Sequence, residues 1–450
     1  MSFAIAILTI VYFKAVALPW LLAALSLPFI CVSALRIASL VMAKMTSTNA
    51  PENEPPRDTV LPTYTILVPL YREAAVVPDL MNALARIDYP AGKLEIFLIV
   101  EAGDRDTKRA VMAGIRARQS AYLLTVPKGS PRTKPRALNF ALSHASGDFV
   151  VVYDAEDQPE PSQLRRAVDM FHRLPCLACV QAGLNIYNAR ETWLTRQFAI
   201  EYTALFDGLL PTLEAIGMPI PLGGTSNHFR RSALEAAGAW DPFNVTEDAD
   251  LGIRLARLGF EVRMLPSTTW EEAPPSLRDW FGQRTRWLKG WLQTYLVHMR
   301  SPLTTLRDLG FARFIGLQVL MGGLLLSAYV HPWIYVLAAR EWLVSSENAQ
   351  LTRLDQVLFW IGVANMLVGY AAGIGLGYRS MLRRGERRLA MHALWMPFYW
   401  LLISLAAYRA LLQFATAPFH WEKTTHRRHA EIRMDSPATY PPKPSDASST

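Results

Sequence analysis

Cysteine is scarce in this 450-residue chain, which carries only Cys31, Cys176 and Cys179. Three cysteines cannot form a disulfide framework. Cys176 and Cys179 make a C-x-x-C pair, but a redox or zinc site would need a thioredoxin-like context or a second ligand pair. The sequence offers neither, and the pair lies in an apolar segment typical of the start of a buried strand. We therefore interpret these cysteines as structural.

Charged residues are also few, at 19% of the chain, whereas hydrophobic residues reach 51%. That balance is apolar for a soluble protein. The formal net charge is +8, but the arginines are dispersed and concentrate beside apolar segments. This distribution follows the excess of basic residues on the cytoplasmic side of membrane proteins. We expect a soluble domain joined to a membrane part, and no nucleic-acid partner.

The N-terminal region, residues 1–45, is predicted to be membrane-embedded. Residues 3–43 are apolar except for Lys14 and Arg36, which is too long for a signal peptide and exceeds the 20 or so residues of a single span. A tight helical hairpin turning near Pro19-Trp20 fits this length, and one long tilted helix is the alternative. Residues 46–62 are polar and rich in proline, which indicates a linker.

Residues 63–275 alternate strand-like and helix-like patterns, which predicts an α/β domain with a mostly parallel sheet. Ligands of such sheets bind at the carboxyl ends of the strands. The predicted strands are Tyr64–Leu70, Leu94–Val100, Tyr122–Val126, Phe149–Tyr153 and Ala178–Tyr187. The predicted helices are Val77–Ile87, Arg105–Arg118, Pro135–His144 and Gln163–Leu174.

The remainder of the chain is predicted to be a membrane region. Residues 276–308 are amphipathic and rich in Trp and Arg, so we expect them to lie along the membrane surface. Transmembrane helices are expected within 309–416, from apolar runs at 311–341, 356–378 and 389–415.

Two features of this region bear on its topology. The run 389–415 could be one span or a re-entrant hairpin around Pro397. The preceding segment Arg379–Arg388 contains five arginines, so we expect it to be cytoplasmic. Residues 432–450 are rich in Pro and Ser and are predicted to be disordered.

Acidic residues follow three predicted strands: Glu73 after the first, Glu101 after the second, and Asp154, Glu156 and Asp157 after the fourth. Clustered carboxylates repel one another unless a cation lies among them. Mg²⁺ and Mn²⁺ prefer oxygen ligands and commonly bridge to phosphates. A dispersed acidic loop surface is the alternative.

Further candidates lie along the same domain. Lys134 and Arg136 precede the fourth strand and could neutralise a diphosphate, or could belong to an exposed helix start. In Thr246-Glu247-Asp248, either acid could act as a general base, and Thr246 could equally cap a helix. In Gln283-Arg284-Thr285-Arg286-Trp287, guanidinium groups suit phosphate and an indole suits a sugar ring, although interfacial helices share this composition.

The order of these elements resembles the processive family 2 glycosyltransferases, which include cellulose, curdlan and hyaluronan synthases. The resemblance covers residues 63–300 and depends on the joint presence of the motifs. It departs from the usual pattern in Asp154-x-Glu156, where Asp-x-Asp is usual, in Glu101, where Asp is usual, and in Arg284, an addition that we associate with curdlan-type and related bacterial exopolysaccharide synthases. The motifs are Pro69-x-Tyr71-x-Glu73, Glu101, Lys134-x-x-x-x-Asn139, Asp154-x-Glu156, Thr246-Glu247-Asp248 and Gln283-x-x-Arg286-Trp287.

The resemblance implies a GT-A type nucleotide-sugar-binding domain flanked by transmembrane helices. Asp248 would deprotonate the acceptor hydroxyl, and inversion would give a β linkage. Asp154 and Glu156 would place Mg²⁺ or Mn²⁺ on the diphosphate. Tyr71, Glu73 and Glu101 would hold the uridine, whereas Gln283, Arg286 and Trp287 would bind the diphosphate and the acceptor's terminal sugar. The other residues expected to bind substrate are Pro69, Lys134, Asn139, Thr246, Glu247 and Arg284.

Two weaker resemblances concern loops. Pro221–His228 is similar to the acceptor-side loop of the same subgroup, and His228 could be catalytic or a loop histidine bonded to backbone. Residues 417–431 contain Trp421, Lys423 and Thr424, which resemble a segment that closes over the nucleotide. A membrane-proximal basic tail is the alternative for this segment, and a gating role requires it to be cytoplasmic.

We therefore expect an inverting enzyme of the bacterial inner membrane, multi-pass, with its catalytic domain in the cytoplasm. It would polymerise a UDP-sugar, with UDP-glucose as the expected donor, into a β-linked polysaccharide and translocate it. Its partners would be the growing polysaccharide, the lipid bilayer and export or periplasmic components. A non-processive transferase acting on a lipid carrier or glycolipid is one alternative, and a non-catalytic membrane scaffold is another.

Overall fold

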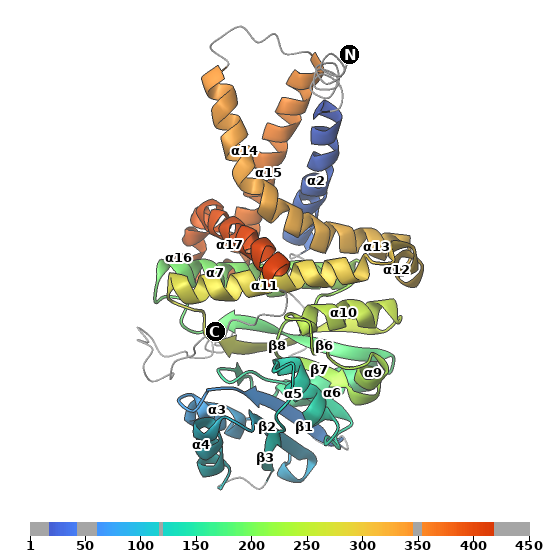
Figure 1. The fold of residues 1–450 in the computed structure, drawn as a ribbon, viewed down its shortest axis with the longest axis vertical. Coiled ribbons are helices and arrows are strands. Elements are labelled where there is room, and N and C mark those ends of the chain that lie inside the picture. Colours follow the sequence, from blue (N-terminus) through green and yellow to red (C-terminus); the bar gives the residue numbers. More distant parts are fainter. Residues whose placement is uncertain (1–17, 43–60, 117–119, 345–352, 418–450) are drawn as a thin grey trace, which may run out of the picture.

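The computed structural model describes residues 18–42, 61–116, 120–344 and 353–417. Most of residues 61–276 form a sheet domain, above which lie a layer of horizontal helices and then a group of upright helices (Figure 1). The predicted gating segment with Trp421, Lys423 and Thr424, the tail 432–450 and most of the linker 46–62 lie outside the described residues.

An eight-stranded mixed sheet forms the centre of this domain, in the order β3-β2-β1-β4-β7-β6-β8-β5. Four of its seven strand pairs are parallel, and β7 is antiparallel to both of its neighbours. The strands are β1 (Tyr64–Leu70), β2 (Leu94–Glu101), β3 (Ala121–Val126), β4 (Phe149–Val152), β5 (Gln158–Pro159), β6 (Leu177–Ile186), β7 (Asn227–Arg230) and β8 (Glu261–Glu271).

The predicted α/β class with a mostly parallel sheet is confirmed. All five predicted strands are present, each within one residue of its expected bounds. The strands β5, β7 and β8 were not predicted. The chain around β7 had the glycines and polar residues of a loop, and β8 contains Pro266 among alternating polar residues.

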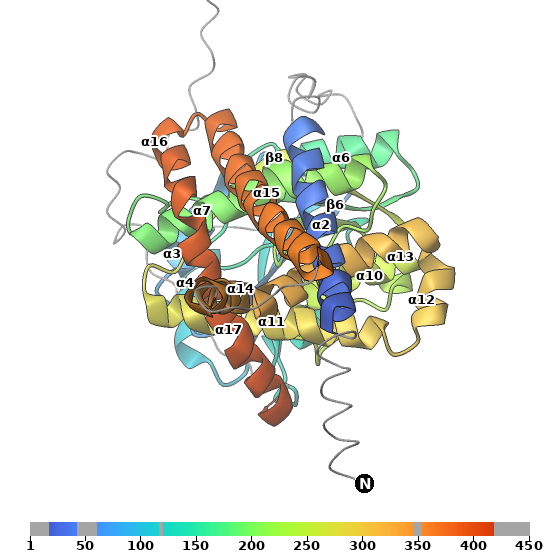
Figure 2. The same ribbon diagram turned by 90° about the horizontal axis from the view of Figure 1, so that it is seen from above.

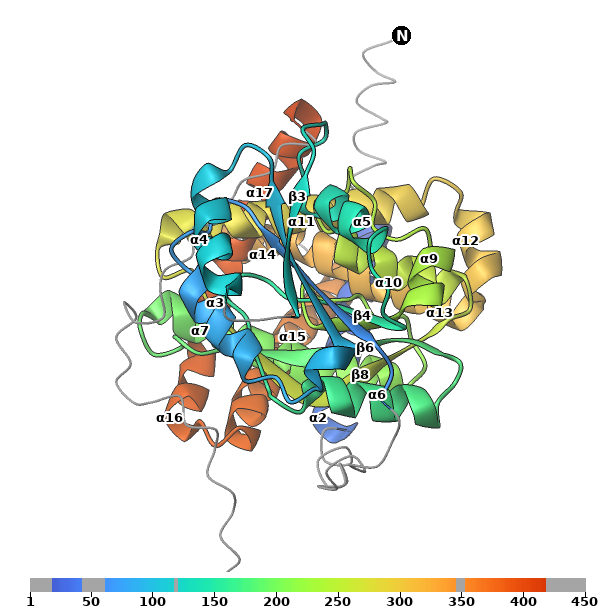
Figure 3. The ribbon, with the colours of Figure 1, turned by 90° about the horizontal axis from the view of Figure 1, so that it is seen from below.

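Helices cover both faces of the sheet, which explains the continuous apolar strands. Alternate residues of β1 point to opposite faces: Ile66 and Val68 pack in one core and Leu67 in the other. Figure 3 shows α3 and α4 on one side of the strands and α5, α9 and α10 on the other. These helices are α3 (Val77–Ala85), α4 (Arg105–Ile115), α5 (Lys134–Leu142), α6 (Gln163–Arg173), α9 (Arg231–Ala236) and α10 (Glu247–Arg257), with a 3₁₀ turn η2 (Ala91–Lys93) before β2.

A layer of helices lies across the molecule between the sheet domain and the upright helices (Figure 1). One apolar core joins this layer to β6, through side chains that include Phe198, Trp280 and Tyr399. The layer comprises α7 (Trp193–Ala204), the π-helical turn η3 (Leu205–Leu209), α8 (Leu210–Ala215), α11 (Leu277–His298), α12 (Pro302–Leu309), α13 (Phe311–Leu317) and α17 (Met396–Thr416).

Within the residues that the structure describes, three segments are long and apolar enough to cross a membrane: Phe311–Trp333, Trp360–Arg383 and Arg387–Thr416. The upright helices are α2 (Leu18–Met42), α14 (Gly323–Val344), which follows the π-helical turn η4 (Gln318–Gly322), and α15 (Arg353–Arg383). Figure 2 shows α2 and α15 from above. Because α2 begins at Leu18, the first half of the predicted N-terminal hairpin lies outside the described residues.

The last apolar segment, predicted to be either one span or a re-entrant hairpin, forms no hairpin around Pro397. It forms α16 (Arg387–Ala390), a 3₁₀ turn η5 (Met391–Trp395) and the single helix α17, with Pro397 in its first turn. Helix α17 lies beside α11 across the base of the upright helices rather than parallel to them (Figure 1). Lys289 on α11 donates from Nζ to the Ala417 carbonyl over 3.4 Å, so the end of α17 lies against α11.

Polar and aromatic side chains meet at the base of the upright helices. The guanidinium of Arg36 on α2 lies 5.3 Å from the ring centre of Trp400 on α17. His331 on α14 bonds the Tyr370 hydroxyl on α15 over 2.5 Å, and both rings pack near Trp400. These contacts, with the Ser33–Asn365 hydrogen bond between α2 and α15, add directional interactions to the apolar packing of the four helices.

A close backbone approach occurs at the middle of α10. A Cβ atom on Gly252 would lie 2.4 Å from the Ile220 carbonyl oxygen and 2.9 Å from the Leu222 nitrogen. We predict that Gly252→Ala lowers the free energy of unfolding by about 1–3 kcal/mol, as overpacking does, despite the higher helix propensity of Ala. Gly92→Ala, where nothing lies within 4 Å, is the control. Thermal unfolding of both variants in detergent measures this, and equal midpoints would contradict the close approach.

Candidate active site

Carboxylates gather at one edge of the sheet. Asp154, Glu156 and Asp157 follow β4, and Glu271 ends β8. Asp157 is 1% exposed, and its Oδ2 accepts hydrogen bonds from the Asp154 backbone nitrogen at 2.7 Å and from the Thr225 hydroxyl. Within the described chain, Oδ1 of Asp157 and Oε1 of Glu271 are buried without a hydrogen-bond partner. Several acidic oxygens therefore share a space that gives them few donors.

Burial and repulsion disfavour ionisation in this cluster. Burial, then the charges of Asp154 and Glu73, raises the pKa of Glu156 well above its ordinary value. Burial and the charges of Asp157 and Glu156 likewise raise the pKa of Glu271. Like charges in a desolvated site hold protons until a cation neutralises them. The cluster is therefore electrostatically suited to a positive ligand.

The donor chemistry fits a hard divalent cation, since every oxygen donor in the cluster is a carboxylate and two oxygens are buried without a partner. The described residues hold no group of three or more His, Cys, Asp or Glu side chains arranged to bind a metal. Mg²⁺ commonly uses one or two carboxylates and completes its shell with water and substrate phosphates. The site thus fits a metal that the protein would share with a diphosphate.

Two cations approach the acids from different elements. Lys134, at the start of α5, lies with Nζ 2.5 Å from Asp154 Oδ1 and 2.7 Å from the Gly224 carbonyl oxygen. Burial lowers its pKa, but Asp154 and the neighbouring acids raise the pKa overall. Burial lowers the pKa of Arg286 on α11, against the charges of Glu247 and Asp154. Lys134 and Arg286 are therefore both exposed to the field of the carboxylates.

The Thr246-Glu247-Asp248 element lies at the start of α10, as expected if Thr246 caps a helix. Thr246 is the N-cap residue, but its side chain makes no capping bond; its backbone nitrogen donates to Asn244 Oδ1 at 3.0 Å. Thr246 instead packs against α11, where a Cβ on Gly290 would lie 2.4 Å from its hydroxyl oxygen. Close packing between α10 and α11 thus fixes the position of the two acids that follow.

Asp248 is half-buried beside Gly224. A Cβ on Gly224 would lie 3.2 Å from Asp248 Oδ2 and 3.9 Å from Lys134 Nζ. Burial raises the pKa of Asp248, and burial together with the Asp248 charge raises the pKa of Glu247 to about 7. The pair therefore changes protonation near neutral pH, which is the range useful for a general base.

The structure thus gathers seven of the predicted site residues into one field of charges. They come from strand ends, the starts of α5 and α10, and the middle of α11, and they are Glu73, Lys134, Asp154, Glu156, Glu247, Asp248 and Arg286.

Other predicted residues lie at the margin of this field. Tyr71 follows β1, and the Arg72 guanidinium lies 5.2 Å from its ring centre. Glu101, at the end of the neighbouring β2, pairs with Arg136 over 3.4 Å. Pro69 lies within β1. Gln283 is 8% exposed on α11, and its Oε1 has no hydrogen-bond partner among the described residues. These positions remain candidates for nucleotide contacts.

Asn139 is occupied by a structural role that differs from the substrate contact expected for it. Its side-chain nitrogen donates to the Trp240 carbonyl over 2.7 Å, and its side-chain oxygen accepts from the Trp240 backbone nitrogen over 3.1 Å. Both the nitrogen and the oxygen of the Asn139 amide are therefore engaged with the backbone of Trp240, which precedes Thr246 in the chain.

Arg284 also lies where a substrate contact is not available. It makes a two-point ion pair with Glu201 on α7, with distances of 2.8 and 2.5 Å, and also bonds the Tyr399 hydroxyl. Its guanidinium lies 4.5 and 4.8 Å from the ring centres of Phe198 and Trp287. Arg284 therefore ties α11 to α7 and α17, which differs from the substrate-binding role predicted for it.

Trp287 shares that aromatic cluster. Its ring stacks on Tyr202 at 6.1 Å between centres, and Arg284 lies over it, although the side chain stays half-buried. The ring is therefore anchored, with a limited surface left for a sugar.

His228 lies in β7, not in a loop, and both of its ring nitrogens bond side chains rather than backbone. The Tyr64 hydroxyl is 2.7 Å from Nδ1, and Gln163 Oε1 is 3.1 Å from Nε2. Burial lowers the pKa of His228 to about 3, so the ring is neutral at physiological pH. His228 therefore links β1, through Tyr64, to α6, through Gln163, within the buried core.

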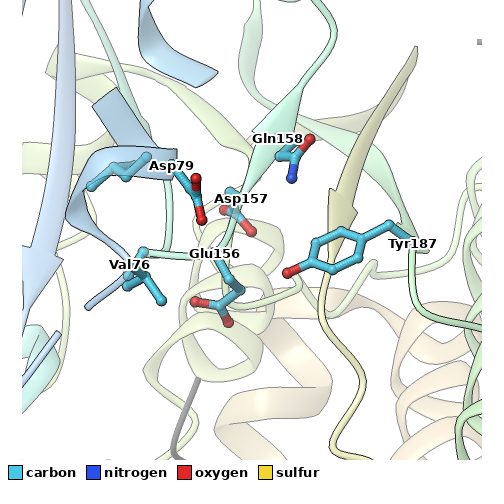
Figure 4. Close-up of a pocket in the computed structure, with 8 residues that line it drawn as sticks. Val76, Asp79, Glu156, Asp157, Gln158 and Tyr187 are labelled. Carbon is cyan, nitrogen blue, oxygen red and sulfur yellow. The ribbon is translucent and has the colours of Figure 1, made fainter. Parts of the chain in front are cut away.

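Tyr187 was missed from the sequence, as was the role of Glu271. A small pocket beside the acids is lined by Asp79, Glu156, Asp157 and Tyr187, and Figure 4 shows the Tyr187 hydroxyl directed toward Glu156. Burial, and then nearby carboxylates, raises the pKa of Tyr187, so it stays a neutral donor. Both residues lie at the ends of strands β6 and β8, and β8 was not predicted.

Comparison with known proteins decides the family. The model described as glycosyltransferase-like family 2 matches residues 62–290, which is just over half of the chain. The chain belongs to glycosyltransferase family 2. It is accordingly a glycosyltransferase, and the seven-residue cluster lies wholly within the matched region.

Curated relatives of this glycosyltransferase make different products. The β-monoglucosyldiacylglycerol synthase of Synechocystis sp. is 30% identical over 64% of this chain and 61% of its own length. The poly-β-1,6-N-acetyl-D-glucosamine synthase of Staphylococcus aureus is 26% identical over 54% of this chain and 58% of its own. The chain spans about half to three fifths of the length of the curated relatives it matches.

The fold is GT-A-like. The mannosyltransferase PcManGT of Pyrobaculum calidifontis, solved with GDP-Man and Mn²⁺, superposes with a TM-score of 0.50, at 19% identity, over 87% of this chain and 99% of its own. At that identity the likeness concerns the fold alone. The GT-A expectation drawn from the motifs is confirmed.

The Arg284–Glu201 pair supplies a test of the structural role assigned to Arg284. The side chain of Arg284 is 8% exposed and that of Glu201 is 27% exposed. We predict that Arg284→Gln lowers the free energy of unfolding by about 3 kcal/mol, the low end for broken buried pairs, because it strands the Glu201 charge. Arg284→Gln/Glu201→Gln should lose less than the sum of the single variants in a double-mutant cycle. Additive losses would contradict the coupling between the two side chains, and a raised donor KM at unchanged stability would point instead to substrate binding.

Proposed function

We propose that the protein is an inverting hexosyltransferase that uses a UDP-sugar and Asp248 as its general base. The observation that carries this proposal is the position of Asp248, half-buried beside Gly224, with Lys134 and Arg286 in the same field. Lys134 links the two groups of acids, since its Nζ bonds Asp154 and also lies, like Asp248 Oδ2, within 4 Å of the position that a Cβ on Gly224 would occupy. UDP-glucose is the proposed donor because the β-monoglucosyldiacylglycerol synthases among the relatives are named for a glucosyl product.

The proposed reaction is a single in-line displacement. The acceptor hydroxyl gives its proton to an Asp248 oxygen and forms a bond to the anomeric carbon. The bond between that carbon and the diphosphate oxygen breaks, and UDP leaves with the electron pair. Attack from the face opposite the leaving group inverts the carbon to the β configuration.

The leaving diphosphate would be stabilised by the two cations. Lys134 and Arg286 are held in place before the donor arrives, so little reorganisation is needed as negative charge develops. When bound to Asp154 and Glu156, Mg²⁺ or Mn²⁺ would supply further Lewis-acid stabilisation of the diphosphate. Tyr71, Glu73 and Glu101 follow adjacent parallel strands, which supports the proposal that they hold the uridine.

A multi-pass position in the bacterial inner membrane, with the sheet domain in the cytoplasm, is proposed from the helices and their charges. Three apolar segments could cross a membrane. The arginines of 379–388 lie at the end of α15 that touches the sheet domain, since Arg384 pairs with Asp207. An excess of arginine marks the cytoplasmic side.

Two acceptors are compatible with this site. A growing β-linked polysaccharide is proposed first, because Gln283, Arg286 and Trp287 lie directly under the membrane helices and a poly-N-acetylglucosamine synthase is among the relatives. A glycolipid or lipid-carrier acceptor is the second, and a specific observation favours it: α17 lies flat, which leaves three upright helices among the described residues to surround a polymer.

Product analysis separates these acceptors. Purified protein in lipid nanodiscs would be incubated with radiolabelled UDP-glucose and either Mg²⁺, Mn²⁺ or EDTA. A polymerase should give a ladder of β-linked products that organic solvent does not extract. A glycolipid synthase should give a single product that organic solvent extracts. Either product should require the metal. Failure to transfer from any of a panel of UDP-sugars would refute the proposed function.

The acid pair sets the expected pH dependence. Because Glu247 titrates near 7 beside Asp248, kcat/KM should fall as pH decreases through about 7, when the pair takes up a proton. We predict that Glu247→Gln moves this acid limb to lower pH, since it removes the like charge beside Asp248.

Asp248→Asn should reduce kcat by about 10²–10⁴-fold, the usual contribution of a general base. Its thermal stability at pH 8 should equal or exceed that of the wild type, because the raised pKa values make ionisation of the pair destabilising there. A normal rate in Asp248→Asn would exclude Asp248 as the base.

A further inference from the structure

An apolar groove opens on the membrane-facing side of α15. It has a volume of about 340 Å³ and lies between α15, which contributes Ala371, Ile374, Gly375 and Tyr378, and the turn η5, which contributes Met391 and Leu394. Tyr378, Met391 and Leu394 are 39, 57 and 61% exposed. The groove lies between two segments that are long and apolar enough to cross a membrane, so the proposed membrane position would expose it to lipid.

The groove ends in a basic cluster at the end of α15 nearest the sheet domain. Arg379 and Arg383 follow Gly375 by one and two helical turns, so they continue the same face of α15. Arg387 and Arg388, which are exposed on α16, precede the other wall. Nη2 of Arg383 is buried and has no hydrogen-bond partner among the described residues.

The nearby acids do not neutralise this cluster. Glu386 pairs with Arg190 over 2.8 Å, and Asp207 makes a two-point pair with Arg384. Arg379 and Arg383 are half-buried at the end of α15 beyond the groove and lack an ion pair of their own among the described contacts, and the proposed topology would put them on the cytoplasmic side.

We propose that this groove binds one membrane lipid with an anionic phosphate headgroup. An acyl chain would fill the space between α15 and η5, and the phosphate would accept hydrogen bonds from Arg379 and Arg383. Guanidinium groups bind phosphate in two-point geometry, and basic pockets between transmembrane helices on the cytoplasmic side suit anionic headgroups. This site is separate from the carboxylate cluster and does not depend on the transfer reaction.

The neighbouring ion pair gives the bound lipid a second effect. Arg384, adjacent to Arg383, holds Asp207 of η3 at 2.5 and 2.6 Å and also reaches Thr268 Oγ1 of β8 at 3.4 Å. Strand β8 ends in Glu271 of the acid cluster. A lipid that orders the end of α15 would therefore support the contact between the membrane helices and the sheet domain.

The test measures lipid retention by the whole protein. The purified protein would be exchanged into nanodiscs of phosphatidylcholine with or without phosphatidylglycerol, and retained lipid would be counted by native mass spectrometry. Wild type should retain one phosphatidylglycerol. Arg379→Gln/Arg383→Gln should bind it about thirtyfold more weakly.

Matched variants separate a specific site from general charge. Arg300→Gln/Arg307→Gln removes the same charge from exposed positions near α12 and should retain the lipid as wild type does. Ala371→Trp fills the groove but keeps every arginine, and it should also lose the lipid. Equal retention by the Arg379/Arg383 variant and this control would overturn the proposal, whatever the transferase assay shows.

The source of the phosphate is decided by competition. Inorganic phosphate and glycerophosphoglycerol should fail to displace the lipid at concentrations where short-chain phosphatidylglycerol succeeds, because the groove needs a chain. Displacement by free phosphate alone would overturn the lipid assignment. A dimer that covers the groove would also overturn the lipid assignment. Such a dimer would be detected in the wild type and abolished by Ala371→Trp.

Discussion

Buried negative charge is the constraint on which the rest of this glycosyltransferase depends. Asp154, Glu156, Asp157 and Glu271 share one edge of the sheet, and no fold tolerates such repulsion without nearby cations. One of the two cations, Arg286, comes from α11, which belongs to the layer beneath the upright helices. The sheet domain by itself therefore lacks one of the two cations that face its carboxylates. The helical layer above it contributes that cation and so forms part of the site.

Much of the sheet could be predicted because β1, β2, β4 and β6 are buried on both faces and form continuous apolar runs. Strand β7 could not, because its pairing with β4 and β6 depends on contacts between residues far apart in the sequence, and such contacts leave no local pattern. The acids after β4 were found since strand ends are where ligands bind. Tyr187 and Glu271 were missed because the ends of β6 and β8 lie near the acids after β4 only through the pairing of β7 between β4 and β6.

Motif spacing misled where helical geometry would have helped. Residues two apart on an α-helix point about 200° away from each other, so Arg284 and Arg286 cannot serve the same site. Arg286 faces the acids, whereas Arg284 faces the same way as Trp287 and meets Glu201. The residues of the motif do not indicate that Arg284 pairs with Glu201, which lies 83 residues away in the sequence. Asn139 shows the same limit, since its partner Trp240 is equally remote.

The flat position of α17 also affects how the chain's topology is counted. Hydropathy alone would let Arg387–Thr416 cross the bilayer and carry the chain to the opposite side. In the structure, however, α17 lies beside α11 across the base of the upright helices, so its apolar length is not by itself evidence of a crossing. Lys289 holds Ala417 one residue from Gly290, which packs on Thr246. The chain therefore leaves α17 within a few side-chain lengths of the proposed catalytic base.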